Sequence, residues 1–363
     1  MLISRKFGFG LCLSFVLFTA FAQQKKYKVH TIAFYNTENL YDAIDDPSVN
    51  DAEFLPDGAE SWTEEKYKTK LKNIAKVISE IGVGTNPDIP TIVGLAEIEN
   101  RGVLEDLVQQ QAISGRGYGI VHFESPDHRG IDVALLYQKK YFKPTSYKKV
   151  PLIVTTDKEQ DADKDKEDDK LKTDSQTKRI FTRDVLLVTG LLDNEEMHFI
   201  VNHWPSRSGG EKKSKPYRDA AALLNKKIID SLYKINPSAK IITMGDFNDG
   251  PNSNSIKNIL DTKGRKDFTK EYGLYNPMVE LAEEGIGTVA YKDAWDLFDQ
   301  MIVSEPLIRK DYNSLRLWKA DIFNKPYLTQ QSGKYKGYPL RNANGEVGYS
   351  DHFAVCLYLI KEI

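Results

Sequence analysis

Acidic, amide and histidine side chains recur in this 363-residue sequence directly beside short apolar segments. The stretch ITMGDFNDGP, residues 242–251, ends an apolar run with Asp246, Asn248 and Asp249. A single carboxylate in such a place is commonly a turn former or a helix cap. Five such segments together predict one shared polar site, because open sheets collect functional groups at their strand ends. The other four are FYNTENL with Asn36 and Glu38, GLAEIEN with Glu97, VNHWPSR with Asn202, His203 and Arg207, and SDHF with Asp351 and His352.

The oxygen donors among these residues predict a hard divalent cation. Glu38, Glu97 and Asp351 offer carboxylates, and Asn36 offers an amide oxygen. Ligands of this kind, with no cysteine among them, suit Mg²⁺ or Mn²⁺, with Ca²⁺ as an alternative, and they disfavour zinc.

Two histidines and an arginine beside a cation suit a phosphate ester. The cation neutralises phosphate oxygens, and Arg207 could bind two of them in a fork. Asp246 is expected to hold or deprotonate a water that Asn248 orients, while His352 stabilises the crowded phosphorus centre or protonates the leaving oxygen. Asp299, which opens DQMIVS, is expected to brace His352. Phosphoryl transfer requires mainly positioning and charge stabilisation, so this set is sufficient.

Other polar residues near these segments have weaker claims on the phosphate. Asn202 is expected to contact it because it directly precedes His203. Arg129, in HRGIDVALLY, could also reach it, although a surface ion pair explains Arg129 equally well, and Arg207 admits the same alternative. Arg218 is expected to serve in packing or a salt bridge, and Asp249 to form a turn.

The elements that position these residues follow from the hydrophobic periodicity. A helix is predicted at residues 64–81, where apolar residues recur every three or four positions after a Thr63 cap, and another near 214–234. A shorter helix is expected through Leu104 and Val108. The alternation of short loops and helices between strands predicts mixed sheets with helices outside. Strands are predicted at residues 28–35, 91–98, 131–137, 183–192, 197–204, 241–245, 299–304 and 352–360.

The N-terminal segment has the plan of a secretory signal peptide over residues 1–22. Arg5 and Lys6 precede an apolar run that ends in Ala20-Phe21-Ala22, and the run is too short for a spanning helix. Cleavage after Ala22 predicts a secreted or periplasmic protein without stable membrane insertion. It removes two of 50 basic residues and leaves 48 against 52 acidic ones, a net charge of −4. A non-specific nucleic-acid coat protein would normally be basic, so a polyanionic substrate must be bound locally or through metal.

The remaining chain, residues 23–363, is expected to form a single domain. Cys356 is its only cysteine, which excludes an intramolecular disulfide and a cysteine-based metal site. Residues 156–179 hold nine acidic and seven basic residues, and they predict a solvated insertion between two strands. This loop does not fit a calcium-binding EF-hand, because lysine replaces the required glycine and glutamate.

The ordered motifs FYNTENL, GLAEIEN, VNHWPSR, GDFND, DQMIVS and SDHFAV resemble the endonuclease/exonuclease/phosphatase superfamily from about residue 30 to the C-terminus. The resemblance implies a four-layer α-β-β-α sandwich, with two packed mixed sheets flanked by helices and the site at one end. It implies that Glu97 is the chief metal ligand, with Asn36, Glu38 and Asp351 nearby. It also implies a water aligned by Asp246 and Asn248, a catalytic His352 oriented by Asp299, and His203 as a phosphate-binding or proton-donating partner.

The leading hypothesis is a secreted, monomeric, metal-dependent phosphodiesterase that hydrolyses DNA or RNA by in-line attack of an activated water. The same machinery would serve a phosphatase or a phospholipase-type phosphodiesterase on a smaller substrate, and a third alternative is a non-catalytic binding protein. Residues 323–341 mix tyrosines with lysines and an arginine. Such a segment either stacks bases and holds a nucleic-acid strand, or is a surface loop with its rings packed down.

Overall fold

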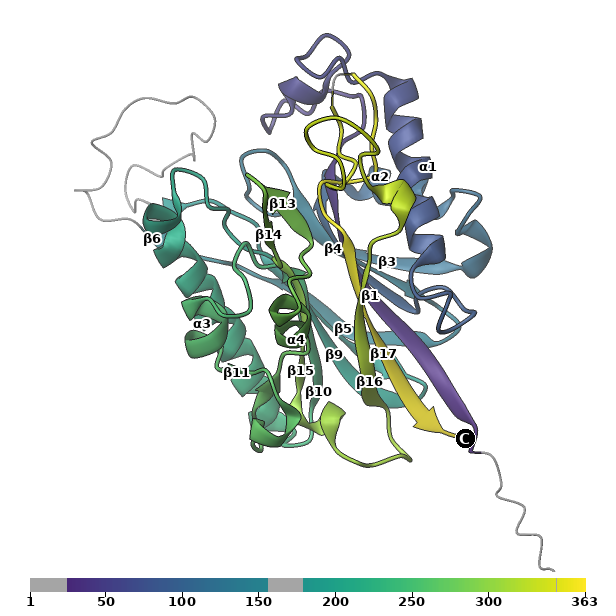
Figure 1. Cartoon of the computed structure of the whole chain (residues 1–363), viewed down its shortest axis with the longest axis vertical. Helices are drawn as coiled ribbons and strands as arrows, with labels where there is room; N and C mark the ends of the chain where they lie inside the picture. The colour runs from purple at the N-terminus through teal and green to yellow at the C-terminus, as the bar shows by residue number, and fades with distance from the viewer. Residues whose placement is uncertain (1–24, 156–178, 344) are drawn as a thin grey trace, which may run out of the picture.

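The computed structural model describes residues 25–155, 179–343 and 345–363, and its two large β-sheets pack face to face between helices (Figure 1). The predicted signal peptide and all but the last residue of the predicted insertion lie outside the described residues. No helix in the described ranges is long and apolar enough to cross a membrane.

The first sheet has six strands and is almost entirely antiparallel. Only β1 and β2 run parallel, and every other neighbouring pair runs antiparallel. In spatial order the strands are β16 (Arg316–Phe323), β17 (Ala354–Glu362), β1 (Tyr27–Leu40), β2 (Ile92–Ile98), β4 (Asp132–Gln138) and β3 (Tyr118–His122).

The second sheet has seven strands and is also mixed. Its parallel pairs are β9 with β10 and β11 with β12. In spatial order the strands are β11 (Thr262–Lys263), β12 (Leu274–Tyr275), β15 (Asp299–Ser304), β10 (Lys240–Asp246), β9 (Glu195–His203), β8 (Val185–Leu192) and β5 (Phe142–Val150). Two small ribbons join β13 (Val289–Tyr291) to β14 (Ala294–Asp296) and β6 (Val154–Thr155) to β7 (Arg179–Ile180).

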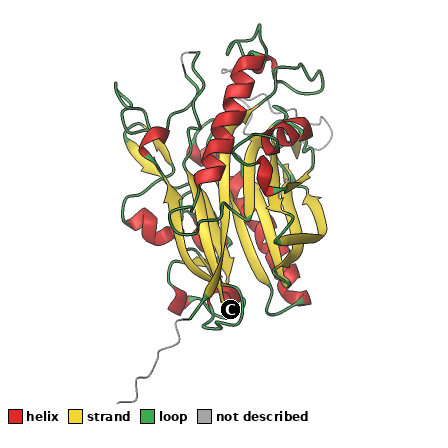
Figure 2. Cartoon of the chain, turned by 90° about the vertical axis from the view of Figure 1, so that its right-hand side faces the viewer, coloured by secondary structure: helices red, strands yellow, loops and turns green. Residues whose placement is uncertain are grey.

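Helices cover the outer faces of both sheets. The helices α1 (Glu64–Glu80) and α2 (Arg101–Val108) lie over the six-stranded sheet, as Figure 2 shows for α1. The long helix α3 (Glu211–Ile235) lies over the seven-stranded sheet, and α4 (Met278–Glu283) is short. Side chains alternate along each strand, so Ile241 packs under α3 while Ile242 and Met244 enter the core between the sheets. The predicted four-layer sandwich is confirmed.

Every predicted strand and helix is present, with ends shifted by a few residues. Nine strands were missed, six of them only two or three residues long, and the three longer ones, β3, β5 and β16, each lie at the edge of a sheet. An edge strand is half solvated, so the polar pattern FKPTSYKKV of β5 carries no continuous apolar signal. Thr63 caps α1 as predicted, and Cys356 is buried in β17. Single turns occur at Ala52–Phe54, Ser114–Arg116, Ser255–Ile259, Lys266–Phe268, Glu305–Ile308 and Pro326–Leu328.

The strand directions bring six chain segments to one end of the sandwich. The strands β1 and β2 end there in the first sheet, and β9 and β10 end there in the second. The strands β15 and β17 begin at the same end because they run antiparallel to β10 and β1. The polar motifs of the sequence therefore share one end of the molecule.

Candidate active site

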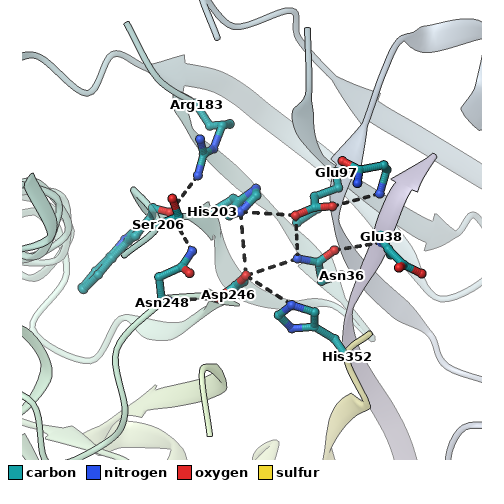
Figure 3. Close-up of polar contacts among 12 residues, drawn as sticks. Asn36, Glu38, Glu97, Arg183, His203, Ser206, Asp246, Asn248 and His352 are labelled. Carbon is teal, nitrogen blue, oxygen red and sulfur yellow. Dashed lines mark hydrogen bonds and ion pairs between the residues drawn. The ribbon is translucent and has the colours of Figure 1, made fainter. Parts of the chain in front are cut away.

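Five polar side chains from both sheets meet at this end, and together they form what we term the site cluster (Figure 3). The amide nitrogen Nδ2 of Asn36 lies 3.2 Å from Glu97 Oε1 and 3.2 Å from Asp246 Oδ2. The same two oxygens each lie 3.7 Å from His203 Nε2, and His352 Nε2 lies 3.9 Å from Asp246 Oδ2. The sequence placed these residues at strand ends, and the fold brings them within hydrogen-bonding or ion-pairing range.

Irregular backbone aims some of these side chains. The pairing of β1 with β2 shifts register between Asn36 and Leu40, and that of β2 with β4 shifts between Ala96 and Ile98. Glu97 sits in the second irregularity with a φ of 63°, and Asn248 follows β10 with a φ of 50°. Such conformations cost free energy for residues other than glycine and cluster at functional sites. Here the bulge turns the Glu97 carboxylate toward Asn36 and His203.

Asp299 braces His352 as predicted from the sequence. Its Oδ2 lies 2.7 Å from Nδ1 of His352, and its side chain is fully buried. This contact turns Nε2 of the imidazole toward Asp246. Burial lowers the pKa of His352, but the carboxylates of Asp299, Asp351 and Asp246 outweigh that effect and hold the pKa well above its usual value. These carboxylates therefore favour the protonated ring, which can donate from both nitrogens.

Asp246 lies at the centre of the negative charge. Its Oδ1 accepts a hydrogen bond of 2.9 Å from the backbone N–H of Asn248. Burial raises the pKa of Asp246 to about 7, and the nearby Asp299 and Glu97 add to this against the opposing effect of His352. The amide Nδ2 of Asn248 donates to the carbonyl of Trp204 at 3.0 Å, which fixes the side chain beside Asp246.

His203 is a neutral, fully enclosed member of the site cluster. Burial lowers its pKa well below the usual value, and the positive charges of Arg183, Arg129 and His352 lower it further. Its Nδ1 has no hydrogen-bond partner within the described residues. The neutral ring can donate one hydrogen bond and accept another, as a phosphate-binding or proton-transferring group requires.

The donors at this end of the sandwich fit a hard divalent cation. Carboxylate and imidazole atoms of Asp246, Asp299 and His352 lie within 4.8 Å of one another. Asp299 Oδ1 is buried with no partner among the described residues, and Asp246 is crowded by other carboxylates. A cation would relieve this concentration of negative charge. Glu97 and Asn36 lie at the cluster as predicted, and Asp351, one-third exposed, places Oδ1 3.7 Å from His352 Nε2.

Glu38 does not face the site cluster, which argues against its predicted role as a direct metal ligand. Its carboxylate lies 3.3 Å from Nζ of the fully buried Lys70 and accepts a hydrogen bond of 3.0 Å from the backbone N–H of Asn342. Arg341 lies 3.4 Å away on the outer side. Residues at 36 and 38 diverge because the backbone leaves regular strand geometry between them, with a φ of 53° at Glu38. Glu38 instead anchors the segment that leads to Asp351 and His352.

Asn202 also lies apart from the site cluster, which corrects its predicted contact with phosphate. Successive strand residues point to opposite faces, so His203 faces the cluster and Asn202 faces α3. The side-chain nitrogen Nδ2 of Asn202 donates to Thr243 Oγ1 at 2.9 Å, and its side-chain oxygen Oδ1 accepts from Asn225 Nδ2 at 2.6 Å. This fully buried amide ties α3 to the sheet.

Arg207 lies beside the site cluster, held by the turn after β10. Its Nε donates to the carbonyl of Asn248 at 3.0 Å, and it lines a cavity of about 310 Å³ with Trp295 and Leu297. Asp249 is more than a turn former, because its carboxylate pairs with Arg207 and, at 2.8 Å, with the buried Arg218. The prediction of a salt-bridge role for Arg218 is confirmed.

Two arginines, Arg129 and Arg183, act on His203 through their positive charge. Arg129 is partly exposed, and its Nε lies 3.8 Å from Asp127 Oδ1. Its positive charge lowers the pKa of His203. Arg183 was missed as a site residue because it precedes an apolar strand without a polar motif around it. Its guanidinium donates to Asp127 at 2.9 Å and to the carbonyl of Trp204 at 2.8 Å. It thereby joins the loop carrying Arg129 to the end of β9.

The sequence model of the Endonuclease/Exonuclease/phosphatase family matches residues 31–361. In a comparison with curated protein sequences, no protein matches this chain.

Solved structures with the same fold share little sequence with this chain. Truncated TDP2 from Caenorhabditis elegans has 14% identity and a TM-score of 0.52, with 91% of this chain and 97% of that chain covered. The Bacteroides thetaiotaomicron mannosyl-6-phosphatase Bt3783 has 15% identity and a TM-score of 0.50, with 91% and 99% covered. The human Nocturnin catalytic domain, solved with a bound sulfate anion, has 15% identity and a TM-score of 0.50, with 92% and 97% covered. These similarities establish a shared fold.

Proposed function

The chain belongs to the Endonuclease/Exonuclease/phosphatase family of metal-dependent phosphoric ester hydrolases, and from that premise we propose that it is a phosphodiesterase that cleaves DNA or RNA. The observation that carries the proposal is the convergence of Asn36, Glu97, His203, Asp246 and His352 in one buried cluster, with Asp299 bonded to His352 at 2.7 Å. All of these side chains suit a phosphate and a water. None is a nucleophile of the serine or cysteine type.

The geometry supports a separate task for each residue in phosphoryl transfer. Asp246, whose Oδ1 is fixed by the N–H of Asn248, is placed to accept a proton from an attacking water. His352, protonated and braced by Asp299, is placed to donate a hydrogen bond to a phosphate oxygen or a proton to the leaving oxygen. His203 is placed to hold a second phosphate oxygen.

Glu97 and Asp351 would hold Mg²⁺ or Mn²⁺, with Ca²⁺ as an alternative ion, and Asn36, whose Nδ2 donates to Glu97, would hold that carboxylate in place. A divalent ion bound there supplies neutralisation of phosphate charge and polarisation of the ester. Arg207, bonded to the carbonyl of Asn248, and Arg129, whose charge acts on His203, would bind phosphate oxygens of a longer substrate.

A phosphomonoesterase is the second candidate, because a mannosyl-6-phosphatase shares the fold over nearly its full length. TDP2 and Nocturnin share the same fold at similar TM-scores, so the fold alone does not distinguish a phosphodiesterase from a phosphomonoesterase. Exposed aromatic rings and lysines, which a small phosphate would leave unused, favour the longer substrate.

A substrate panel tests the proposal. The protein from residue 23 onward is incubated with plasmid DNA, single-stranded RNA, sphingomyelin and p-nitrophenyl phosphate, each with Mg²⁺ and with EDTA. We expect cleavage of at least one nucleic acid that EDTA abolishes. Hydrolysis of p-nitrophenyl phosphate alone would establish the phosphatase instead, and no hydrolysis with metal supplied would favour a binding protein.

We further propose that the chain is secreted or periplasmic and acts as a monomer, with residues 1–22 as a cleaved signal peptide. N-terminal sequencing of the exported protein should begin at Gln23, and size-exclusion chromatography with light scattering should give one chain. An N-terminus at Met1 would contradict the signal peptide.

A further inference from the structure

A row of aromatic rings leads from Phe353, the residue after His352 in the chain, to the surface. Phe353 follows His352 directly, and its ring stacks on Trp295 with centroids 5.7 Å apart and planes 17° apart. Tyr338 follows at 6.1 Å from Trp295, and Tyr335 at 5.6 Å from Tyr338. Phe353 is buried, while Trp295 is 41% exposed and Tyr335 is 49% exposed. We term Trp295, Tyr338 and Tyr335 the aromatic surface.

The aromatic surface is held in place although it is open to solvent. Tyr338 donates its hydroxyl to Asp293 Oδ1 at 2.8 Å and accepts from the N–H of Asp293 at 2.7 Å, which joins its loop to the β13–β14 ribbon. Within the loop, the N–H of Gln330 donates to the carbonyl of Tyr338 at 2.8 Å. Exposed rings gain little hydrophobic stabilisation, so folding alone does not account for fixing them in this arrangement.

Positive charge lies at the outer end of the row. Lys334 Nζ lies 5.3 Å from the centroid of the Tyr335 ring, and Lys336 follows on the other side of that tyrosine. Neither lysine pairs with a carboxylate in the described part of the chain. Lys292, at the tip of the β13–β14 ribbon, lies over Tyr291 at 5.1 Å. The outer end therefore combines stacking rings with lysines that form no ion pair among the described residues.

We propose that the aromatic surface stacks the unpaired bases of a single-stranded nucleic acid whose scissile phosphate lies at His352, with Lys334 and Lys336 holding the backbone beyond them. This inference rests on the proposed function and names its substrate class. Ring faces accept any base, and adjacent lysines match the phosphates between bases. The lone phosphate of a sugar phosphate would occupy the site cluster and leave these lysines, three rings away, without a ligand. In a duplex the bases are stacked on one another and cannot offer their faces to the rings.

The chain offers a matched control for the outermost ring. Tyr272 is 48% exposed, close to the 49% of Tyr335, and its ring packs edge-on against Tyr233 at 5.4 Å, while the ring of Tyr335 lies tilted against Tyr338 at 5.6 Å. It precedes β12, which pairs with β15 at the Ser304 end, away from Asp299. Tyr335→Leu and Tyr272→Leu thus remove similar rings at opposite ends of the sandwich.

The experiment measures binding and chemistry separately. Binding of a fluorescein-labelled twelve-residue thymidine oligonucleotide and of a twelve-base-pair duplex is followed by anisotropy in EDTA, which prevents cleavage. Hydrolysis of bis(p-nitrophenyl) phosphate with Mg²⁺ reports the site cluster, because this small diester does not reach Tyr335. Glucose 6-phosphate serves as the sugar-phosphate probe. The proteins are the wild type, Tyr335→Leu, Tyr272→Leu and the double variant Lys334→Ala/Lys336→Ala.

We expect Tyr335→Leu to raise the Kd for the single strand at least about fivefold, as loss of one stacked base implies. Tyr272→Leu should bind as the wild type does, and both should hydrolyse the small diester normally. The lysine variant should lower the salt dependence of single-strand binding by about 1.4 in the slope of log K against log salt. A wild-type Kd for Tyr335→Leu would overturn the proposal. Equal weakening of duplex binding and single-strand binding by Tyr335→Leu would also overturn the proposal. An effect seen only with glucose 6-phosphate would overturn it as well. Failure of the wild type to hydrolyse any diester would instead refute the proposed function, whatever the binding result.

Discussion

Replacing Lys70 by methionine tests how the buried support behind the site cluster works. Lys70 Nζ is fully buried and lies 3.3 Å from Glu38, 3.0 Å from the carbonyl of Tyr349 and 3.4 Å from Asn342 Oδ1. Burial lowers the pKa of Lys70 and raises the pKa of Glu38 to about 7, so desolvation offsets much of the attraction within the pair. The net stabilisation by the intact pair is therefore small, but removal of one partner leaves the other buried and unpaired.

The expected loss follows from what remains around Glu38. Loss of one partner of a buried ion pair costs about 3–5 kcal/mol in general. Arg341 and the N–H of Asn342 stay in contact with Glu38, and methionine replaces most of the lysine stem, so we expect the lower end, about 3 kcal/mol. Because this pair holds the segment leading to His352, turnover should fall as well.

Urea denaturation in EDTA measures this loss without a contribution from bound metal. Lys68→Met on the same helix is the control, because Lys68 is exposed and its ion pair with Glu64 should contribute less than about 0.5 kcal/mol. The double variant Lys70→Met/Glu38→Gln should recover part of the loss by removing the unpaired charge. A Lys70→Met protein as stable as the Lys68→Met control, or a double variant no more stable than Lys70→Met, would refute the reasoning.

Four further variants test the site and its surroundings. His352→Ala and Asp246→Ala should each lower turnover by about 10²–10⁴-fold, since they remove proton transfer; undiminished turnover by either would contradict the mechanism. Glu195→Gln should lower stability by about 1–2 kcal/mol at pH 7, because lysine hydrogen bonds outweigh burial and lower the Glu195 pKa to about 2. That stability is present above pH 4.5 and is lost as the pH falls toward 2, so wild type and variant should converge in acid, and a constant difference would refute the assignment. In Arg183→Met the pKa of His203 should rise, because the positive charge of Arg183 is among those that lower it. NMR titration of the His203 imidazole measures this pKa, and an unchanged value would contradict the assignment.

The sequence alone was enough to predict most of the side chains that meet in the site cluster. Motifs ending in Asp246, Asn248, Asp351 and His352 have a residue chemistry that turn formation does not require, and the predicted brace from Asp299 is present at 2.7 Å. The buried strands were also found, because an apolar run between polar ends is a local property of the chain.

Errors arose where a side chain's direction depended on neighbours distant in sequence. Asn202 and His203 are adjacent, yet one faces α3 and the other faces Asp246, and only the register of β9 on β10 shows which is which. The sequence predicts Glu38 as a metal ligand. In the structure Lys70 and Asn342, both distant from it in the sequence, hold its carboxylate away from the site cluster.

The sequence by itself determined the inventory of this protein: which strands are buried, which polar groups stand at their ends, and that hard oxygen donors and imidazoles must meet a phosphate. Those properties are local, since they depend on residue type and spacing. The tertiary structure decided which of the groups meet, that Arg183 supports the site, and that Trp295, Tyr338 and Tyr335 form one surface. Such assignments depend on the packing of two sheets and their loops, where segments hundreds of residues apart come within hydrogen-bonding distance.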